Sequence, residues 1–193
     1  LGCAPEELFD EFLDNTPIGC EGLVLQPLWS PKIKQGWAKG SILGFSDVHT
    51  RAHIYRAIIE GICFGLYEGL ASIEKRAGYK IESIMVSGGG SLSDRICQIL
   101  ADVMGLPVKK TQTYENSALG CAMLTYLGMG TFKTPQEAVD HMVHDGKTYT
   151  PDMKNHEQYM MLYHTVYERI YRKNSKTFRN IRAYNRRYPV PKH

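Results

Sequence analysis

A short glycine-rich turn between an apolar strand and an apolar helix limits the folds open to this chain more than any other feature. Residues 81–86 predict a strand, 88–90 a tight turn, and Ser91 or Ser93 the N-cap of a helix whose apolar side chains recur at three and four residues. Gly105 predicts the end of that helix, because glycine readily adopts the left-handed conformation that closes helices. Strands that alternate with helices in this way are typical of α/β layer folds.

The rest of the chain continues this alternation. The other expected elements are a helix from Pro5, strands at 22–27 and 41–45 separated by a loop that holds both tryptophans, a long helix from Asp47 or Thr50 to about Gly78, a brief strand at 108–110, helices at 116–127 and from Pro135, a polar loop at 145–152, and a long final helix. The small residues of 116–127 predict close packing against a neighbour. The tyrosines along one face of the final helix predict a buried stripe.

The composition excludes several classes of protein. With 193 residues, 43% of them hydrophobic and 22% charged, the chain has the make-up of a globular protein rather than a disordered or collagen-like one. It has no apolar run of about 18 residues, so we expect no membrane partner. The five cysteines form no C-x-x-C pair, which predicts reduced thiols in a cytoplasmic protein. The N-terminal segment lacks the features of a signal peptide and predicts an excised fragment of a longer protein.

The basic residues are concentrated at the C-terminus. From Arg169 onward there are nine Lys and Arg residues and no Asp or Glu, whereas the remainder carries 14 basic and 20 acidic residues, a net charge of −6. A basic tail with tyrosines can bind nucleic acid or anionic lipid. Basic side chains also complement the dipole at the C-terminal end of a helix. The second interpretation is favoured because the body of the chain is acidic, and we expect no nucleic-acid partner.

The glycine turn is the best candidate for a ligand site. Glycines let a ligand approach the backbone, and the helix that follows presents unpaired N–H groups and a positive dipole end to phosphate. The alternative, that the glycines serve only the geometry of the turn, stays open here. The run Gly146-Lys147-Thr148 ends like a phosphate-binding P-loop but lacks the glycine five residues earlier. His141 and His144 have the spacing of a metal pair on a helix, but no further ligand is nearby, and surface histidines are favoured.

Spacing alone identifies no catalytic residue. The sequence shows no Ser-His-Asp spacing, and Cys97 and Cys121 fall on apolar helix faces where inert packing is expected. The acidic residues near the ends of expected elements are Asp47, Glu60, Asp94, Asp102 and Glu115. Nothing in their positions selects a general base among them. The residues by themselves therefore predict a nucleotide-binding α/β domain.

Four ordered motifs resemble the FGGY family of carbohydrate kinases. They are Gly40-Ser41-Ile42-Leu43-Gly44-Phe45 with, after seven intervening residues, His53-Ile54-Tyr55-Arg56-Ala57-Ile58-Ile59-Glu60; Ser87-Gly88-Gly89-Gly90; the helix Ile96-Cys97-Gln98-Ile99-Leu100-Ala101-Asp102 followed by Gly105-Leu106-Pro107-Val108; and Glu115-Asn116-Ser117-Ala118-Leu119-Gly120-Cys121-Ala122. Together they cover about residues 20 to 145. The first is similar to the second signature of the family, with Phe45 in place of a smaller aliphatic residue. The three-glycine form is similar to xylulokinase-type members.

The resemblance implies an α/β fold of the ribonuclease H-like, actin-like ATPase class, in which two domains hold the nucleotide in a cleft. We expect residues 1–150 to form the C-terminal, ATP-binding domain of such a kinase. Residues 151–193 would form a C-terminal helix and basic tail packed on it or extending from it. The partner would be the protein's own N-terminal kinase domain, which is expected to hold the catalytic base, and a homodimer is left open.

The resemblance also implies an activity, the ATP-dependent phosphorylation of a sugar or polyol hydroxyl with Mg²⁺ as cofactor. The fragment alone would be inactive. The alternative is a family member that has lost catalysis and acts as a nucleotide-binding regulator. Xylulose-like ketoses are favoured as substrates only by the resemblance.

Five residues are implied as nucleotide-binding. Gly88, Gly89 and Gly90 would pass the backbone beside the adenosine and the α-phosphate. Ser93 aligns with the Asn that contacts the adenine side in glycerol kinases, and Asp94 beside it would either replace that contact or cap the helix. The resemblance implies no catalytic base and no metal ligand among these residues.

Overall fold

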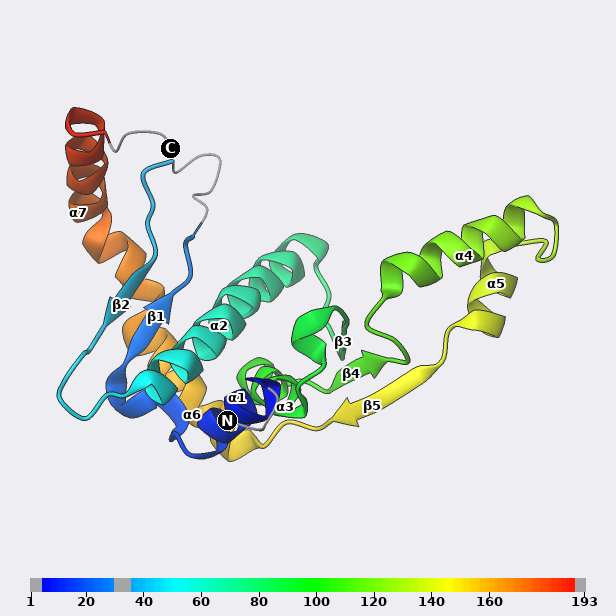
Figure 1. The fold of residues 1–193 in the computed structure, drawn as a ribbon, viewed down its shortest axis with the longest axis horizontal. Coiled ribbons are helices and arrows are strands. Elements are labelled where there is room, and N and C mark those ends of the chain that lie inside the picture. The colour runs from blue at the N-terminus through cyan, green and yellow to red at the C-terminus, as the bar shows by residue number, and fades with distance from the viewer. Residues whose placement is uncertain (1–4, 30–35, 190–193) are drawn as a thin grey trace. The chain divides into compact units, whose positions relative to one another are not determined.

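The computed structural model describes residues 5–29 and 36–189. They form two compact units, one made of the residues up to Ile73 together with those from Glu157 onward, and the other of Glu74–His156 (Figure 1). In the described part of the chain, no helix is both long enough and apolar enough to cross a membrane.

The first unit is mainly helical. Its elements are α1 (Pro5–Asp14), a 3-10 turn (Ile18–Gly22), β1 (Val24–Gln26), β2 (Ser41–Leu43), α2 (Arg51–Ala77), α6 (Met153–Leu162), a π-helical turn (Tyr163–Tyr167) and α7 (Glu168–Arg187). The last residues of α2 and the first of α6 are assigned to the second unit. β1 and β2 pair antiparallel with Leu25 opposite Ile42, which confirms the two strands expected here. Residues 30–35 of the loop between them lie outside the described residues.

Helix α2 lies close against β1 because a glycine faces the strand. A Cβ at Gly61 would lie 2.3 Å from the carbonyl oxygen of Leu25, so a larger residue would force the two elements apart. The small apolar core at this contact consists of Cys20, Leu23, Leu25 and Ala57. The helix starts directly after Thr50 rather than near Asp47. The Thr50 amide donates to His53 Nδ1 at 3.2 Å and its hydroxyl lies 3.0 Å from the same nitrogen, which organises the first turn.

The tyrosine stripe of the final helix is buried, as predicted. Tyr159, Tyr163 and Tyr167 surround Phe64 of α2, with ring centroids 6.0, 5.8 and 5.1 Å from the Phe64 ring. The expected long final helix is confirmed: the backbone is helical from Met153 to Arg187, with a π-helical turn between α6 and α7. Residues 169–187 of the basic tail belong to α7, and the buried ring of Phe178 anchors this helix to the unit.

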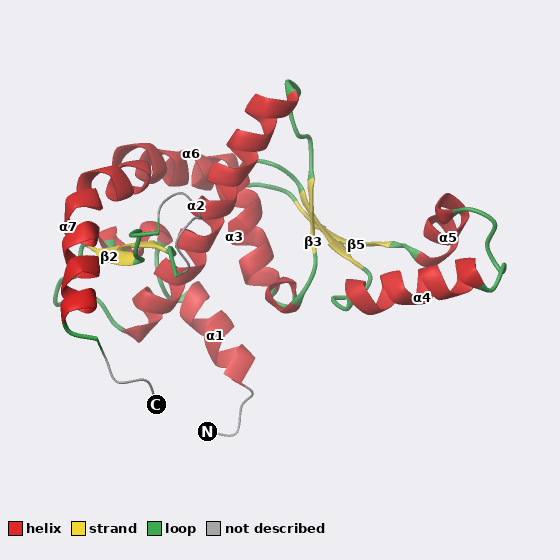
Figure 2. Ribbon diagram, turned by 90° about the horizontal axis from the view of Figure 1, so that it is seen from above, coloured by secondary structure: helices red, strands yellow, loops and turns green. Residues whose placement is uncertain are grey.

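The second unit contains a three-stranded sheet. Its elements are β3 (Ile84–Val86), a 3-10 turn (Gly89–Ser91), α3 (Asp94–Met104), β4 (Val108–Thr111), α4 (Asn116–Gly128), α5 (Pro135–Met142) and β5 (Asp145–Tyr149). β4 is the middle strand, parallel to β3 and antiparallel to β5. Figure 2 shows this sheet in yellow, with β3 and β5 labelled. The expected strand, turn and helix are confirmed, and Gly105 ends α3 with a φ of 64°. α4 packs along α5 but none of its described residues is buried.

The expectation of a loop at 145–152 is wrong for its first half, because β5 forms there and pairs with β4. Val108 lies opposite Tyr149, and Gly146 approaches so closely that a Cβ there would lie 2.8 Å from the carbonyl oxygen of Lys110. β5 is an edge strand of the described sheet. Edge strands carry charged residues such as Lys147 that hide the apolar alternation by which strands are recognised.

Candidate functional site

The three glycines lie between the end of β3 and the start of α3. Gly88 has a φ of 89° and a ψ of 178°, a conformation that favours glycine. Its carbonyl oxygen accepts hydrogen bonds from the amide and the hydroxyl of Ser91, at 3.0 and 2.7 Å. The carbonyl oxygen of Gly89 accepts from the Leu92 amide at 3.1 Å. These bonds close the tight turn that the sequence predicts.

The outer surface of this turn is open. A Cβ placed on Gly88, Gly89 or Gly90 would meet no heavy atom within 4 Å. Gly88 needs to be glycine because its φ is positive, but the φ angles of Gly89 and Gly90 are not in the left-handed region. Neither the backbone nor packing within the described residues requires glycine at these two positions. Their main-chain atoms are accessible to a ligand that a side chain would obstruct.

The N-terminus of α3 adjoins the turn. Ser93 is the N-cap, because its Oγ accepts a hydrogen bond from the Ile96 amide at 3.2 Å. Ser91, the other expected cap, belongs to the turn instead, and its carbonyl oxygen accepts from the Cys97 thiol at 3.6 Å. Cys97 is buried, as predicted, and burial raises the pKa of its thiol. The first-turn amides of α3 and the positive end of its dipole are thereby placed beside the open glycines.

Asp94, the first residue of α3, is held by side chains of β4 and β5. Its carboxylate accepts hydrogen bonds from Lys110 Nζ and from Tyr149 Oη, each at 2.6 Å, and from Lys147 Nζ. These three donors hold the pKa of the Asp94 carboxyl well below its usual range. Lys110 also donates to the carbonyl oxygen of Leu92 at 3.3 Å. Two ammonium groups face one carboxylate, so the start of α3 carries a net positive charge.

The three residues that donate to Asp94, which are Lys110, Lys147 and Tyr149, are not among the residues expected at the site. In the sequence, Lys147 belongs to a P-loop pattern that fails and to a segment expected to be a loop. Only the pairing of β5 with β4 brings Lys147 and Tyr149 to Asp94. The one available signal is that these two residues are two apart, which places them on the same face once the segment is a strand.

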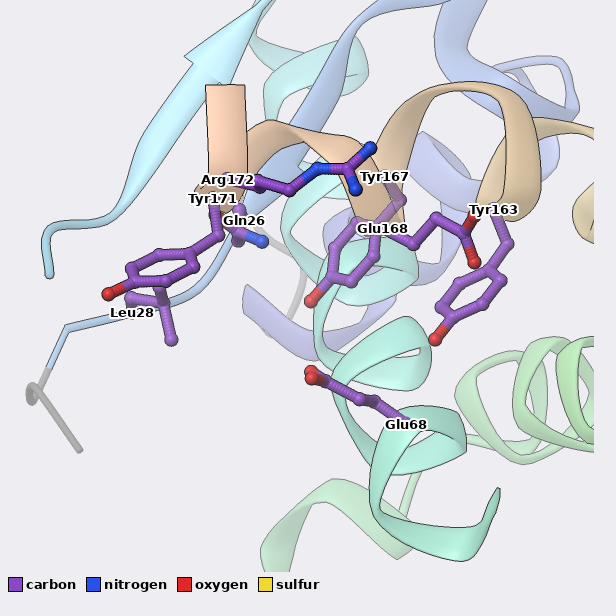
Figure 3. Close-up of a pocket in the computed structure, with 8 residues that line it drawn as sticks. All are labelled: Gln26, Leu28, Glu68, Tyr163, Tyr167, Glu168, Tyr171 and Arg172. Carbon is purple, nitrogen blue, oxygen red and sulfur yellow. The ribbon is translucent and has the colours of Figure 1, made fainter. Parts of the chain in front are cut away.

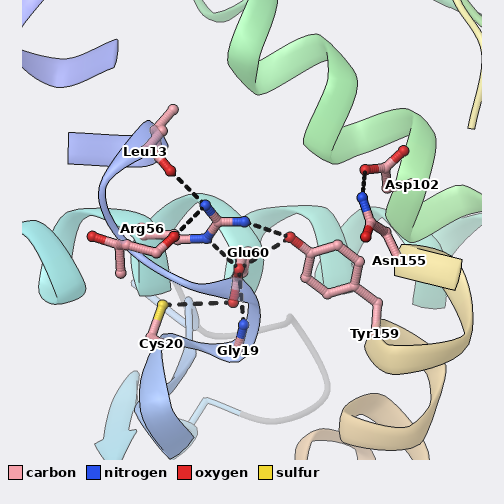
Figure 4. Close-up of polar contacts among 9 residues, drawn as sticks. Leu13, Gly19, Cys20, Arg56, Glu60, Asp102, Asn155 and Tyr159 are labelled. Atoms are coloured by element: carbon pink, nitrogen blue, oxygen red, sulfur yellow. Dashed lines mark hydrogen bonds and ion pairs between the residues drawn. The ribbon is translucent and has the colours of Figure 1, made fainter. Parts of the chain in front are cut away.

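Asp102 of α3 has a structural role. Its side chain is buried and accepts hydrogen bonds from Gln98 Nε2 at 2.8 Å and from the Asp152 amide at 2.9 Å. It also accepts one from Asn155 Nδ2 at 2.9 Å (Figure 4). These bonds connect α3 to the start of α6. A carboxylate that is only 4% exposed and already accepts from three donors is not placed to act as a general base.

Glu60 also lies in a buried polar cluster. Its carboxylate accepts hydrogen bonds from Arg56 Nε at 2.8 Å, Tyr159 Oη at 3.1 Å, the Gly19 amide at 3.2 Å and the Cys20 thiol at 3.6 Å (Figure 4). Burial raises the pKa of the Glu60 carboxyl, and the Arg56 guanidinium opposes this shift. The cluster holds the 3-10 turn next to α2.

His141 and His144 do not share a helix face and both are exposed, as expected for the favoured interpretation, surface histidines. His141 lies in α5, whereas His144 lies beyond its end. Among residues 5–29 and 36–189, no group of three or more His, Cys, Asp or Glu side chains could hold a metal ion. The described cysteines are free thiols, and Cys121 is exposed, so the inert packing predicted for it is wrong.

The chain is similar in sequence to curated carbohydrate kinases. It is 35% identical over 176 residues to the xylulose kinase of Staphylococcus epidermidis and 31% identical over 151 residues to the glycerol kinase of Deinococcus radiodurans. The alignments cover 88% and 77% of this chain but only 35% and 30% of those proteins. The chain therefore spans about a third of the length of these relatives.

The fold is similar to that of a solved kinase. The crystal structure of the xylulose kinase from Rhodospirillum rubrum matches with a TM-score of 0.75 and 27% identity, over 90% of this chain and 35% of that one. This similarity confirms the expected α/β fold of the ribonuclease H-like, actin-like ATPase class. The family model described as "FGGY family of carbohydrate kinases, C-terminal domain" matches residues 25–129, more than half of the chain. The chain belongs to the FGGY family of carbohydrate kinases and corresponds to its C-terminal domain.

Proposed function

We propose that the intact protein is an ATP-dependent carbohydrate kinase and that this chain supplies its nucleotide-binding part. One observation carries the proposal: Gly89 and Gly90 leave open main-chain surface at the start of α3 although neither packing nor backbone conformation requires glycine there. A ligand that lies against the main chain would explain why both positions are glycine, because a side chain there would obstruct it. Membership of a carbohydrate kinase family makes ATP the natural candidate.

In this proposal the backbone of the turn lies beside the adenosine and the α-phosphate of ATP. The first-turn amides of α3 and the helix dipole favour a negatively charged group at this place. Lys110 and Lys147 add positive potential there, because Asp94 neutralises only one of their two charges. Ser93 fixes the first turn of α3 as its N-cap. We infer that Asp94 positions α3 through its three donors rather than contacting the adenine.

We assign neither the Mg²⁺ ion nor the catalytic base to residues of this chain. Mg²⁺ keeps several waters and binds mainly through nucleotide phosphates and one or two carboxylates, and it would neutralise phosphate charge. Because no cluster of ligating side chains is present in the described residues, no residue here is assigned to the ion. The catalytic base and most sugar contacts are expected in the N-terminal domain. The chain by itself should therefore bind nucleotide without catalysing phosphoryl transfer.

We propose a ketose of the xylulose class as the acceptor. The support is that a curated relative and a similar solved structure are both xylulose kinases. Glycerol kinase is also among the relatives, so polyols belong in any test of the substrate. In-line positioning of the acceptor hydroxyl against the γ-phosphate would be the main contribution of the two domains.

A phosphorylation screen of the full-length protein tests this proposal. ADP release would be measured with ATP and each of D-xylulose, D-ribulose, glycerol and D-gluconate as the acceptor. We expect sustained ADP release with at least one acceptor and the highest kcat/KM with D-xylulose. A folded full-length protein that releases no ADP with any sugar, polyol or sugar acid would refute the kinase assignment. Activity confined to glycerol would refute only the substrate class.

A further inference from the structure

Lys110 of β4 contacts the segment that contains the glycine turn, residues 87–93, at both of its ends. In the parallel pairing of β3 with β4, Lys110 lies opposite Val86, the last residue of β3, so its main chain is beside the point where the chain enters the turn. Its Nζ donates hydrogen bonds to the carbonyl oxygen of Leu92 at 3.3 Å and to Asp94 Oδ1 at 2.6 Å. One residue of the sheet therefore fixes where this segment begins and where it ends.

The bond to Leu92 acts on a part of the turn that has little packing of its own. The Leu92 side chain is exposed, whereas its amide closes the turn by donating to the carbonyl oxygen of Gly89 at 3.1 Å. Lys110 binds the carbonyl oxygen of the same residue. A shift of Leu92 would therefore change the position of the Gly89 main chain, against which ATP is proposed to lie.

The two lysines at Asp94 differ in how firmly they are held. The side chain of Lys110 is 18% exposed, and its Nζ lies 5.5 Å from the centroid of the Tyr149 ring. The side chain of Lys147, whose Nζ donates to Asp94 from the other edge of β5, is 60% exposed. Burial alone would lower the pKa of Lys110, but the hydrogen bond to Asp94 contributes to a raised pKa, so the ammonium group stays charged. The two lysines thus carry the same charge but hold the turn to different degrees.

A cavity in the first unit is another place where a ligand could bind, but it does not suit a nucleotide. Its volume is about 150 Å³, below the roughly 300–1,000 Å³ that is usual for sites of larger ligands. Figure 3 shows the carboxylates of Glu68 and Glu168 among the side chains that line it. Carboxylates repel phosphate groups. The cavity therefore does not compete with the glycine turn for ATP.

We propose that Lys110 is the positioning residue of the nucleotide site, which it serves by fixing the glycine turn relative to β3 and β4 rather than by touching ATP. This inference rests on the proposed function, because it requires ATP to lie at the turn. A residue that supplied only positive charge could be replaced by Lys147, which carries the same charge beside the same carboxylate. Positioning instead depends on the bonds of Lys110 to Leu92 and Asp94. A binding surface that is held in its bound conformation avoids the cost of ordering when the ligand arrives.

The test is a calorimetric titration of ATP into the full-length protein and its lysine variants. Lys110→Met and Lys147→Met each remove one positive charge, and in each case Asp94 keeps the other lysine and Tyr149 as donors, so both variants should fold. We expect Lys110→Met to weaken ATP binding at least about tenfold and Lys147→Met less than about threefold. Lys109→Met removes the same charge from the opposite face of β4, and this matched control should keep wild-type affinity.

Three further readouts separate positioning from general damage. Lys110→Arg keeps a charged donor and should recover most of the affinity that Lys110→Met loses. In Lys110→Met the KM for ATP should rise, while the KM for the acceptor should change less than about twofold, because most sugar contacts are expected in the N-terminal domain. Hydrogen exchange of the Leu92 amide should be faster in Lys110→Met than in Lys147→Met, since that amide closes the turn.

The outcomes distinguish this inference from the proposed function. If the wild type binds ATP but Lys110→Met and Lys147→Met lose equal affinity, Lys110 acts through charge alone, and the inference is wrong while the proposed function stands. An equal rise of both KM values in Lys110→Met would also contradict the inference. A wild-type protein that binds no ATP at about 1 mM would refute the proposed function and this inference with it. If Lys110→Met does not fold, Lys110→Gln, which is shorter and neutral, decides, and wild-type affinity in that variant would overturn the inference.

Discussion

Replacing Arg56 with methionine would remove the centre of the buried polar cluster in the first unit. The guanidinium donates to Glu60 Oε1 at 2.8 Å, to the carbonyl oxygens of Leu13 and Thr16 at 2.5 and 2.7 Å, and to Tyr159 Oη at 3.1 Å. Arg56 is 8% exposed and Glu60 is 2% exposed, so water does not replace these bonds. Methionine has a similar length but no donor.

The expected loss of stability arises because the Glu60 carboxylate stays buried without the Arg56 charge. Removing one partner of a buried ion pair destabilises a protein by about 3–5 kcal/mol, because the other charge remains buried. Glu60 would keep the hydrogen bonds from Gly19, Cys20 and Tyr159. Its pKa, already raised by burial, would rise further, and uptake of a proton would limit the loss. We therefore expect the lower end of the range, about 3 kcal/mol.

Hydrogen exchange of the full-length protein measures this loss locally. The Gly19 amide donates to Glu60, so a peptide that contains Gly19 reports on the cluster. A loss of about 3 kcal/mol corresponds to roughly hundredfold faster exchange. Arg76→Met, an exposed arginine on the same helix, is the matched control and should leave this peptide unchanged. Adding Glu60→Gln to Arg56→Met should recover part of the protection, since it removes the unpaired charge.

If the Gly19 peptide of Arg56→Met exchanges within about threefold of the wild-type rate, the expected cost is refuted. The ion pair would then contribute little to holding the turn. Faster exchange in the double variant than in Arg56→Met would also refute it, because an unpaired buried carboxylate would then not be the source of the cost.

Gly105→Ala should lower the melting temperature more than Gly130→Ala, because both glycines have positive φ but only at Gly105 would a Cβ collide, 2.7 Å from the His156 ring. The left-handed conformation alone costs a residue with a Cβ about 1–2 kcal/mol at either position, and equal shifts in thermal melts would contradict the packing argument. Asp94→Asn should destabilise the protein at neutral pH and progressively less below about pH 4, since a carboxyl with a lowered pKa contributes stability above its unfolded pKa and loses it as the pH falls toward the folded one. Melting curves from pH 2 to 7 check this, and a difference from wild type that persists undiminished to pH 2 would show that charge on Asp94 is not its source.

Features that depend on neighbours along the chain could be predicted from the sequence. Ser93 caps α3 and Gly105 ends it, as expected, because capping and the left-handed end of a helix are decided within one turn of backbone. The glycine turn is equally local, and its position next to α3 follows from the strand and the helix on either side. The sequence left two possible caps for α2, Asp47 and Thr50. The structure shows that the helix begins directly after Thr50.

Features that depend on distant pairing could not be predicted. β5 exists because its backbone pairs with β4, and Gly146 permits a close approach to Lys110 that no nearby residue signals. The same pairing brings Lys147 and Tyr149 to Asp94 across more than 50 residues. The cluster around Glu60 likewise joins side chains from three segments. In each case the residue types alone do not indicate which distant side chains they bind.

The central claim is that the glycine turn binds ATP, and a calorimetric titration of ATP into the full-length protein and its Gly89→Val variant tests it most directly. A Cβ at Gly89 meets no atom within 4 Å and its φ is not positive, so the melting temperature should change by less than about 2 °C. Gly69→Val, an equally open position on α2, is the matched control and should keep wild-type affinity. We predict that Gly89→Val binds ATP at least about tenfold more weakly, a loss of about 1.4 kcal/mol. A folded Gly89→Val protein with wild-type affinity for ATP would contradict the account.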